Sequence, residues 1–148
     1  MPFSNDYAHN ILNYLFSKTN QLTPPESIYI GLSTTDPTNG SFNEIVGGSN
    51  GYHRVLICKR GSGYPDVIGS ASNRAISNIN QINWTKATAD WPEAVGFGLF
   101  SSEQGGSPFF YGLIETPVTC AAGSVALLDP NTMKISFPTA DIVDVTEG

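Results

Sequence analysis

The strongest evidence for the type of fold lies in residues 94–114, which read AVGFGLF (94–100), SSEQGGSP (101–108) and FFYGLI (109–114). Apolar residues alternate with glycines in the first run, as in a strand whose glycines let another backbone or ring approach closely. The glycine-containing segment before the second apolar run is typical of a hairpin loop. The stretch therefore predicts an antiparallel β-hairpin.

The rest of the chain continues this pattern of short strands and frequent turns. Other short apolar or β-branched runs predict strands at residues 27–32, 52–59 and 80–84. Residues 124–128 and 133–137 are predicted to form another hairpin around DPN at 129–131. Fifteen Gly and ten Pro separate these runs. We therefore predict a mainly β fold, an antiparallel β-sandwich or jelly-roll-like body over residues 27–137.

The N-terminal arm, residues 1–22, departs from the β pattern. Its apolar residues recur with helical spacing, because Tyr7, Ile11 and Leu15 stand at i, i+4 and i+8. The pattern predicts one short helix from Asn5 or Asp6 to about Ser17. A helix of this length is too short to be stable alone, so it must pack on the β body or on a neighbouring subunit.

The C-terminal tail, residues 138–148, is predicted to be extended. It carries Ile142, Val143 and Val145 among acidic residues. An extended segment of this kind can add a strand to the sheet edge of another chain. Together with Tyr7, Ile11, Leu15 and Tyr64, these three residues are the candidate partner interface.

Length and charge limit the possible functions. A chain of 148 residues fits a single domain. Seven basic against 13 acidic residues give a net charge of −6, and the basic residues are scattered, which argues against binding to nucleic acid or to an anionic membrane. The first residues lack the pattern of a signal peptide, so synthesis in the cytoplasm is expected.

The residues able to carry out chemistry are few. His9 and His53 lack the spacing of a zinc site, and Cys58 and Cys120 are more consistent with two separate thiols than with a scaffold, although one disulfide stays open. A thiol site of Cys58, His53 and Asp36 has no supporting spacing. The sequence therefore predicts no catalytic residue, no metal ligand and no cofactor.

Two features could serve sugar chemistry. Asp90 and Glu93 flank Trp91 and form the closest approach to a glycosidase carboxylate pair, although a turn cap and a solvated acid explain them equally well. Tyr64 lies in a glycine-rich loop and is the best candidate for an exposed ring that stacks on a sugar. Phe97, Phe100, Phe109 and Phe110 are expected in the core.

The order of several short motifs resembles a family of small tailed-bacteriophage proteins, often labelled tail fibre or minor structural proteins. The motifs are SIYIGLSTTDP at 27–37, GYHRV at 51–55, TADW at 88–91, GFGLF at 96–100 and the later GG, YGL and Pro117. The resemblance spans most of the chain and implies a virion structural protein. A compact chain of this size is also similar to trimeric capsid decoration, or cement, proteins.

Three functions follow from the residues and the resemblance together. The first is a capsid decoration protein that binds and stabilises the major capsid shell, on the capsid exterior, as a homo-oligomer with a trimer favoured. The second is a tail fibre or tail-associated receptor-binding protein, with a sugar site near Tyr64 or Trp91. The third is a small glycan hydrolase that uses Asp90 and Glu93. The first two need no reacting group.

Overall fold

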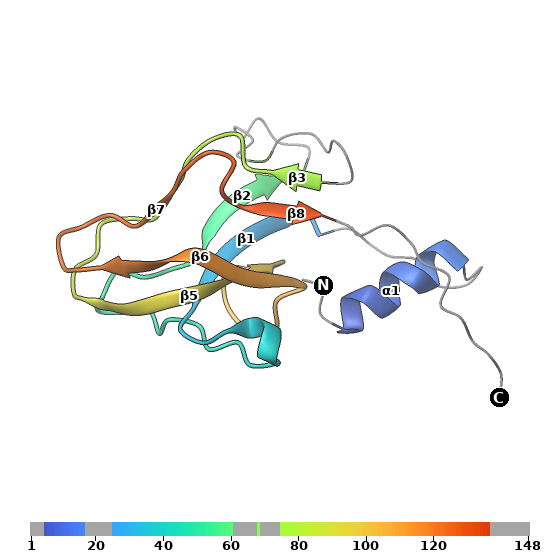
Figure 1. Ribbon diagram of the computed structural model, residues 1–148, viewed down its shortest axis with the longest axis horizontal. Coiled ribbons are helices and arrows are strands. Elements are labelled where there is room, and N and C mark those ends of the chain that lie inside the picture. The colour runs from blue at the N-terminus through green and yellow to red at the C-terminus, as the bar shows by residue number, and fades with distance from the viewer. Residues whose placement is uncertain (1–4, 17–24, 61–67, 69–74, 137–148) are drawn as a thin grey trace.

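The computed structural model describes residues 5–16, 25–60, 68 and 75–136, which form one α-helix, one short 3-10 helix and eight strands (Figure 1). Their order is α1 (Asn5–Phe16), β1 (Ser27–Ser33), η1 (Pro37–Asn39), β2 (Val55–Lys59), β3 (Ala75–Ser77), β4 (Ile82–Asn83), β5 (Trp91–Phe100), β6 (Phe110–Cys120), β7 (Leu127–Leu128) and β8 (Lys134–Ser136). The predictions of a mainly β fold and of one short N-terminal helix are confirmed. The C-terminal tail lies outside the described residues.

The main sheet has four antiparallel strands in the order β2-β1-β5-β6. The predicted hairpin is confirmed, since β5 pairs with β6 across the loop 101–109. In β1 and β5, Ile30 lies opposite Leu99 and Leu32 opposite Phe97, so these four side chains share one face of the sheet. All four are buried, and they form the floor of the hydrophobic core.

A second layer of short ladders covers this apolar face. It consists of β3 paired with β8 and β4 paired with β7, both antiparallel, and Figure 1 shows it above the main sheet. Its buried residues join those of the main sheet in one continuous core; they include Ile82, Trp84, Ala87, Ala126, Met133 and Ile135. The arrangement is that of a small, incomplete sandwich.

The predicted hairpin of residues 124–128 and 133–137 is wrong. The strands of this region, β7 and β8, pair instead with β4 and β3, which lie about 50 residues earlier in the chain. The turn at Asp129 is real, because Thr132 donates a backbone hydrogen bond of 3.3 Å to the Asp129 carbonyl. The turn bends one long segment that lies alongside residues 75–87 in space. It does not join two strands that pair with each other.

Asn78 explains why this second layer is split into two ladders. Its side chain is completely buried, donates to the carbonyl oxygens of Asn80 (2.8 Å) and Asp129 (2.9 Å), and accepts a bond from the Met133 amide (3.0 Å). Its backbone amide and carbonyl are also bonded to the facing segment. One buried amide side chain thus satisfies the backbone groups that the break in the ladder would leave unpaired.

The glycines of β5 lie on the opposite face of the main sheet, where they allow the close approach that their spacing predicts. A Cβ atom added at Gly96 would lie 2.5 Å from Pro37 Cδ, and one added at Gly98 would lie 2.7 Å from Phe42 Cε2. The segment around η1 is therefore pressed against bare backbone. Asp36 caps η1 by accepting a 2.8 Å hydrogen bond from the Thr38 amide.

The outer strand β6 contains a wide bulge. Ala94 lies opposite Val118 and Gly96 opposite Leu113, so residues 114–117 of β6 face the single residue Val95. The bulge carries exposed Glu115 and Pro117. Bulges, charges and prolines protect the edge of a sheet from pairing with another chain, so this part of the edge is a poor acceptor for an added strand.

Replacing Gly98 by alanine tests the close packing of this face. The new methyl group would collide with the Phe42 ring and with Pro108 Cβ, which would lie 2.9 Å away, so we expect a loss of about 1–3 kcal/mol in the free energy of unfolding. Glu93→Ala, at an exposed position of the same strand, is the control and should change it by less than about 0.5 kcal/mol. Equal urea midpoints for the two variants would contradict the close packing.

Candidate functional site

Helix α1 presents an exposed apolar face. Leu12, Leu15 and Phe16, spaced i, i+3 and i+4, are 57%, 64% and 83% exposed. They share one side of the helix, since residues at this spacing are neighbours on a helix surface. Apolar side chains so widely exposed and so close together are typical of a surface that binds another protein. Figure 1 shows α1 beyond the end of the strands.

The structure locates only part of the predicted partner interface. Ile11 is half-buried and Leu15 is exposed on α1, and Tyr7 belongs to the same helix. Tyr64, Ile142, Val143 and Val145 lie outside the described residues. The contribution of the C-terminal tail and of Tyr64 therefore stays a prediction, as does the sugar site near Tyr64.

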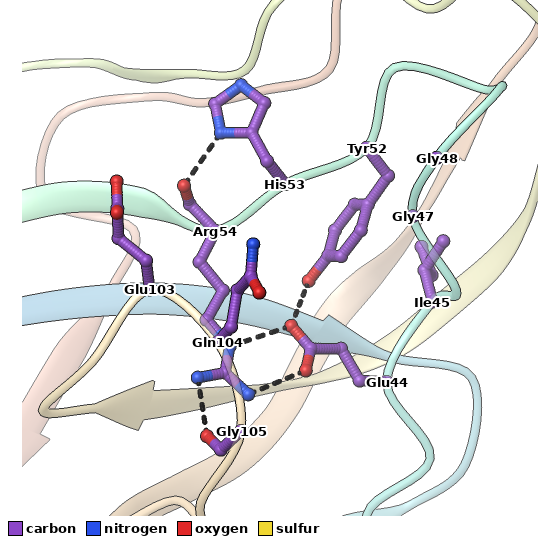
Figure 2. Close-up of a pocket in the computed structure, with 10 residues that line it drawn as sticks. All are labelled: Glu44, Ile45, Gly47, Gly48, Tyr52, His53, Arg54, Glu103, Gln104 and Gly105. Carbon is purple, nitrogen blue, oxygen red and sulfur yellow. Dashed lines mark hydrogen bonds and ion pairs between the residues drawn. The ribbon is translucent and has the colours of Figure 1, made fainter.

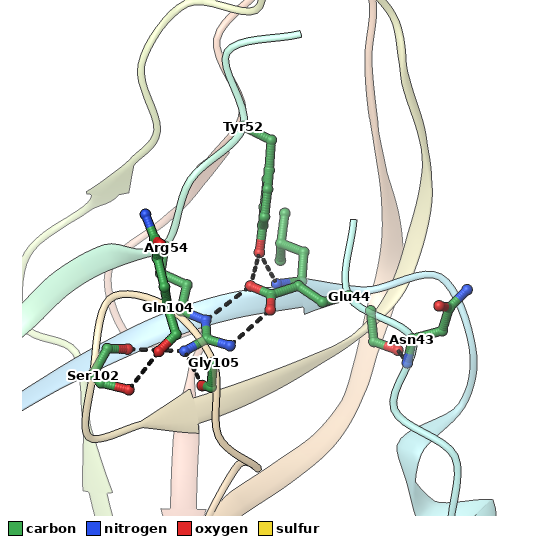
Figure 3. A network of polar contacts seen from close by, with 9 residues as sticks. Asn43, Glu44, Tyr52, Arg54, Ser102, Gln104 and Gly105 are labelled. Carbon is green, nitrogen blue, oxygen red and sulfur yellow. Dashed lines mark hydrogen bonds and ion pairs between the residues drawn. The ribbon is translucent and has the colours of Figure 1, made fainter. Parts of the chain in front are cut away.

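The most strongly connected polar group in the described residues is the guanidinium of Arg54, the residue just before β2. It forms a two-point ion pair with Glu44, with Nε–Oε2 and Nη2–Oε1 distances of 2.9 and 2.8 Å. Its Nη1 atom donates to the carbonyl oxygens of Ser102 and Gly105, both at 2.9 Å (Figure 3). Four of its five N–H groups are therefore engaged.

The guanidinium of Arg54 also lies over the face of the Phe100 ring. The Arg54 Cζ atom lies 3.4 Å from the ring centroid, which is the geometry of a cation–π contact. Arg54 is only 8% exposed and Phe100 only 2%. A buried charge of this kind is tolerated when it is paired and hydrogen-bonded. The Glu44 carboxylate and the two loop carbonyl oxygens supply the pairing and four of the five hydrogen bonds.

Tyr52 completes the network at the edge of the main sheet. Its hydroxyl donates to Glu44 Oε2 at 2.7 Å (Figure 2). The same hydroxyl accepts a 2.9 Å bond from the Leu32 amide of β1. Burial, with a further contribution from the Glu44 carboxylate, raises the pKa of Tyr52 above its ordinary value. The phenol therefore stays protonated and acts as a fixed link between the strand and the carboxylate.

These residues line a pocket of about 460 Å³ whose rim includes Glu103 and Gln104 (Figure 2). Inside it, Arg54, Glu44 and Tyr52 bond to one another and to the backbone. The network therefore fixes the positions of two loops, 43–46 and 102–105, rather than presenting free charges to a ligand. The sequence motif GYHRV contains both Tyr52 and Arg54, but nothing in the sequence indicates their partners.

The carboxylates considered for sugar hydrolysis occupy different settings. Asp90 accepts a 2.8 Å hydrogen bond from the Ala122 amide and so ties two loops together. Trp91 is buried, donates from Nε1 to the Asn50 carbonyl at 2.8 Å and packs edge-on against Tyr52. Glu93 is exposed on β5. Asp90 and Trp91 thus have structural roles, as in the simpler of the two interpretations.

His53, Cys58 and Cys120 do not form a common site in the structure. His53 bonds through its two ring nitrogens to the Arg54 carbonyl and the Thr85 hydroxyl, at 2.7 and 3.0 Å. Cys58 and Cys120 are both free thiols, which answers the question that the sequence left open. In the part of the chain that the structure describes, no group of three His, Cys, Asp or Glu side chains could hold a metal ion. None of the described helices is long and apolar enough to span a membrane.

Comparison with known proteins identifies one family. A family model described as Podophage GP4 fiber I protein gp80 matches residues 2–136. A search of the curated proteins finds no match. The matched region includes α1, both loops that Arg54 holds and all eight strands.

Replacing Arg54 by lysine tests the network around it. Lysine keeps the charge but cannot form the two-point pair with Glu44 and bond two carbonyl oxygens at once. We expect the free energy of unfolding to fall by about 2 kcal/mol or more. Arg60→Lys, at an exposed position just after β2, should change it by less than about 0.5 kcal/mol. An Arg54→Lys protein with the same free energy of unfolding as the unsubstituted protein would contradict the role of the network.

The raised pKa of Tyr52 predicts a loss of stability at alkaline pH. Above about pH 10 the unfolded chain loses the Tyr52 proton while the folded chain keeps it, so stability falls by up to about 1.4 kcal/mol per pH unit from this group. Urea unfolding between pH 8 and about pH 11 measures this loss. Tyr52→Phe has no such proton, so its stability should fall less steeply above pH 10. Identical slopes for the two proteins would contradict the assignment.

Proposed function

The chain belongs to the family of Podophage GP4 fiber I protein gp80, and on that basis we propose that it is a structural subunit of a bacteriophage fibre. The resemblance to phage virion structural proteins is thereby confirmed. The proposed activity is binding: the protein joins other virion proteins through exposed apolar surfaces and performs no covalent chemistry. The description of the matching family is the observation that carries the choice of a fibre.

The distribution of exposed apolar residues supports a binding role. Helix α1 exposes apolar side chains to solvent. The polar groups of the Arg54 network, by contrast, are bonded to partners within the chain. A rigid β body together with a helix that exposes apolar side chains suits a subunit that takes a fixed position in an assembly. The tail residues Ile142, Val143 and Val145 are proposed to extend the same contact by adding a strand to a neighbouring virion protein.

Capsid decoration is the alternative location for the same kind of protein. It would place copies over the joints of the major capsid shell, as trimers in the arrangement that the sequence favoured. The acidic net charge of −6 suits an outer surface away from DNA, whether on a capsid or on a fibre. Location on the particle therefore has to be measured directly.

Cryo-electron microscopy of the virion, with the protein marked by a C-terminal tag and gold-labelled antibody, tests the proposal. We expect the label on a fibre and not on the capsid lattice. Label spread evenly over the capsid would establish decoration and contradict the fibre assignment. In the same experiment, a chain lacking residues 138–148 should be incorporated less than the full chain. Equal incorporation would remove the tail from the contact.

A further inference from the structure

A second cavity, of about 490 Å³, lies on the side of the main sheet that faces away from the hydrophobic core. It opens between the loop after η1, which contributes Gly40 and Phe42, and the loop between β5 and β6, which contributes Gly106 and Pro108. The two glycines leave its rim open. A Cβ atom added at Gly40 would meet no atom of a non-adjacent residue within 4 Å, and one added at Gly106 would meet only Ser102 Oγ, at 3.9 Å. A small ligand can therefore enter here.

Three rings form the apolar part of this cavity. Tyr111 of β6 lies opposite Gly98 of β5 in the sheet. Phe42 and Pro108 pack directly over Gly98, at 2.7 and 2.9 Å from the position that a Cβ atom would take, so the three rings meet on one face of the sheet. An edge-on contact with Phe100, at a centroid distance of 5.4 Å, fixes the Phe42 ring. Fixed rings of this kind suit the C–H groups on one face of a sugar ring.

The Arg54–Glu44 pair supplies a polar edge to the same cavity. Among the described residues, Glu44 Oε2 accepts two hydrogen bonds, from the Tyr52 hydroxyl and Arg54 Nε, whereas Oε1 accepts one, from Arg54 Nη2. Nη2 also carries the one N–H group of Arg54 that has no partner in this part of the chain. An unused donor and an unused acceptor thus lie on atoms 2.8 Å apart.

This arrangement matches two hydroxyl groups on neighbouring carbon atoms, because one hydroxyl can accept from Nη2 while the next donates to Oε1. The Glu44 side chain is 25% exposed, so a ligand can reach the carboxylate. Two further hydroxyls line the cavity, those of exposed Ser107 and half-buried Tyr111. Neither has a hydrogen-bond partner within the residues that the structure describes.

We propose that this cavity binds a neutral sugar in its pyranose form. The two charged side chains in its lining are paired with each other, so the site has no unpaired charge to offer a charged ligand. Apolar walls with a few fixed polar groups, in a volume of this size, are typical of small-ligand sites. The sugar ring packs on Phe42, Pro108 and Tyr111, and adjacent hydroxyls bond to the Arg54–Glu44 edge.

Sugar binding would be an activity additional to the proposed contacts with other virion proteins. Those contacts are assigned to α1 and the C-terminal tail, whereas the cavity belongs to the β body. The inference therefore does not rest on the fibre assignment, and its failure would leave that assignment intact.

Saturation-transfer NMR of the full chain tests the proposal with four neutral probes, the methyl glycosides of glucose, galactose, mannose and rhamnose. We expect at least one of them to bind with a dissociation constant of about 1 mM. Methoxytetrahydropyran, which has the same ring without hydroxyl groups, is the matched control and should give no signal. Absence of a signal from all four glycosides at about 10 mM would overturn the inference.

Variants at Tyr111 test whether binding occurs in this cavity. Tyr111→Ala removes a wall and should raise the dissociation constant about tenfold. Tyr111→Phe keeps the ring and the packing of the fold but lacks the hydroxyl, so it should raise the constant about threefold. Tyr14→Ala, on exposed α1 and outside the cavity, is the control and should leave it unchanged.

Amide chemical shifts of the labelled protein locate the bound sugar. On titration with the tightest-binding glycoside, the largest changes are expected at Gly40, Gly106 and Ser107, which line the cavity. Unchanged affinity in both Tyr111 variants would overturn the inference. Largest shift changes in residues outside the cavity would overturn it as well, because the sugar would then bind elsewhere.

Discussion

The structure depends most on the ion pair between Arg54, which is buried, and Glu44, which is partly buried, next to the ring of Phe100. The guanidinium and the carboxylate lose hydration on folding, and this cost is offset only because nearly every donor and acceptor finds a partner. The groups of this network come from the loop after η1, the segment just before β2 and the loop between β5 and β6. One side chain thus joins three segments that are far apart in the sequence.

The position of this pair follows from the way β1 changes partners. β2 pairs with β1 only from Ser27 to Ile30, and beyond that point the β1 edge would lack hydrogen bonds. The Ile45 amide, which donates to the Leu32 carbonyl, and the Tyr52 hydroxyl, which accepts from the Leu32 amide, fill the gap. Glu44 and Arg54 hold the Ile45 amide and the Tyr52 hydroxyl in place, so this side of the sheet is closed and rigid. The side of the sandwich between β6 and the segment 125–134 is open, and there the chain exposes apolar surface.

Local patterns in the sequence predicted the local features of the fold. Helical spacing located α1 to within one residue, and the alternation of Gly96 and Gly98 with apolar residues indicated both a strand and a close approach. The hairpin proposed for residues 124–137 was wrong because its turn is genuine, whereas its strands pair with residues 75–83, a choice that local sequence cannot encode. Arg54 lay in a recognised motif, yet its partner Phe100 is 46 residues away.

We propose that this protein works by covering its exposed apolar surfaces with other protein chains. Hydrogen–deuterium exchange, compared between the dilute protein and the assembled particle, measures this most directly. We expect fast exchange of the α1 amides in the dilute protein and strong protection of the same amides after assembly. Exchange in β1 and β5 should change little, because the sheet already protects these strands. Amides of α1 that exchange equally fast in both states would contradict it.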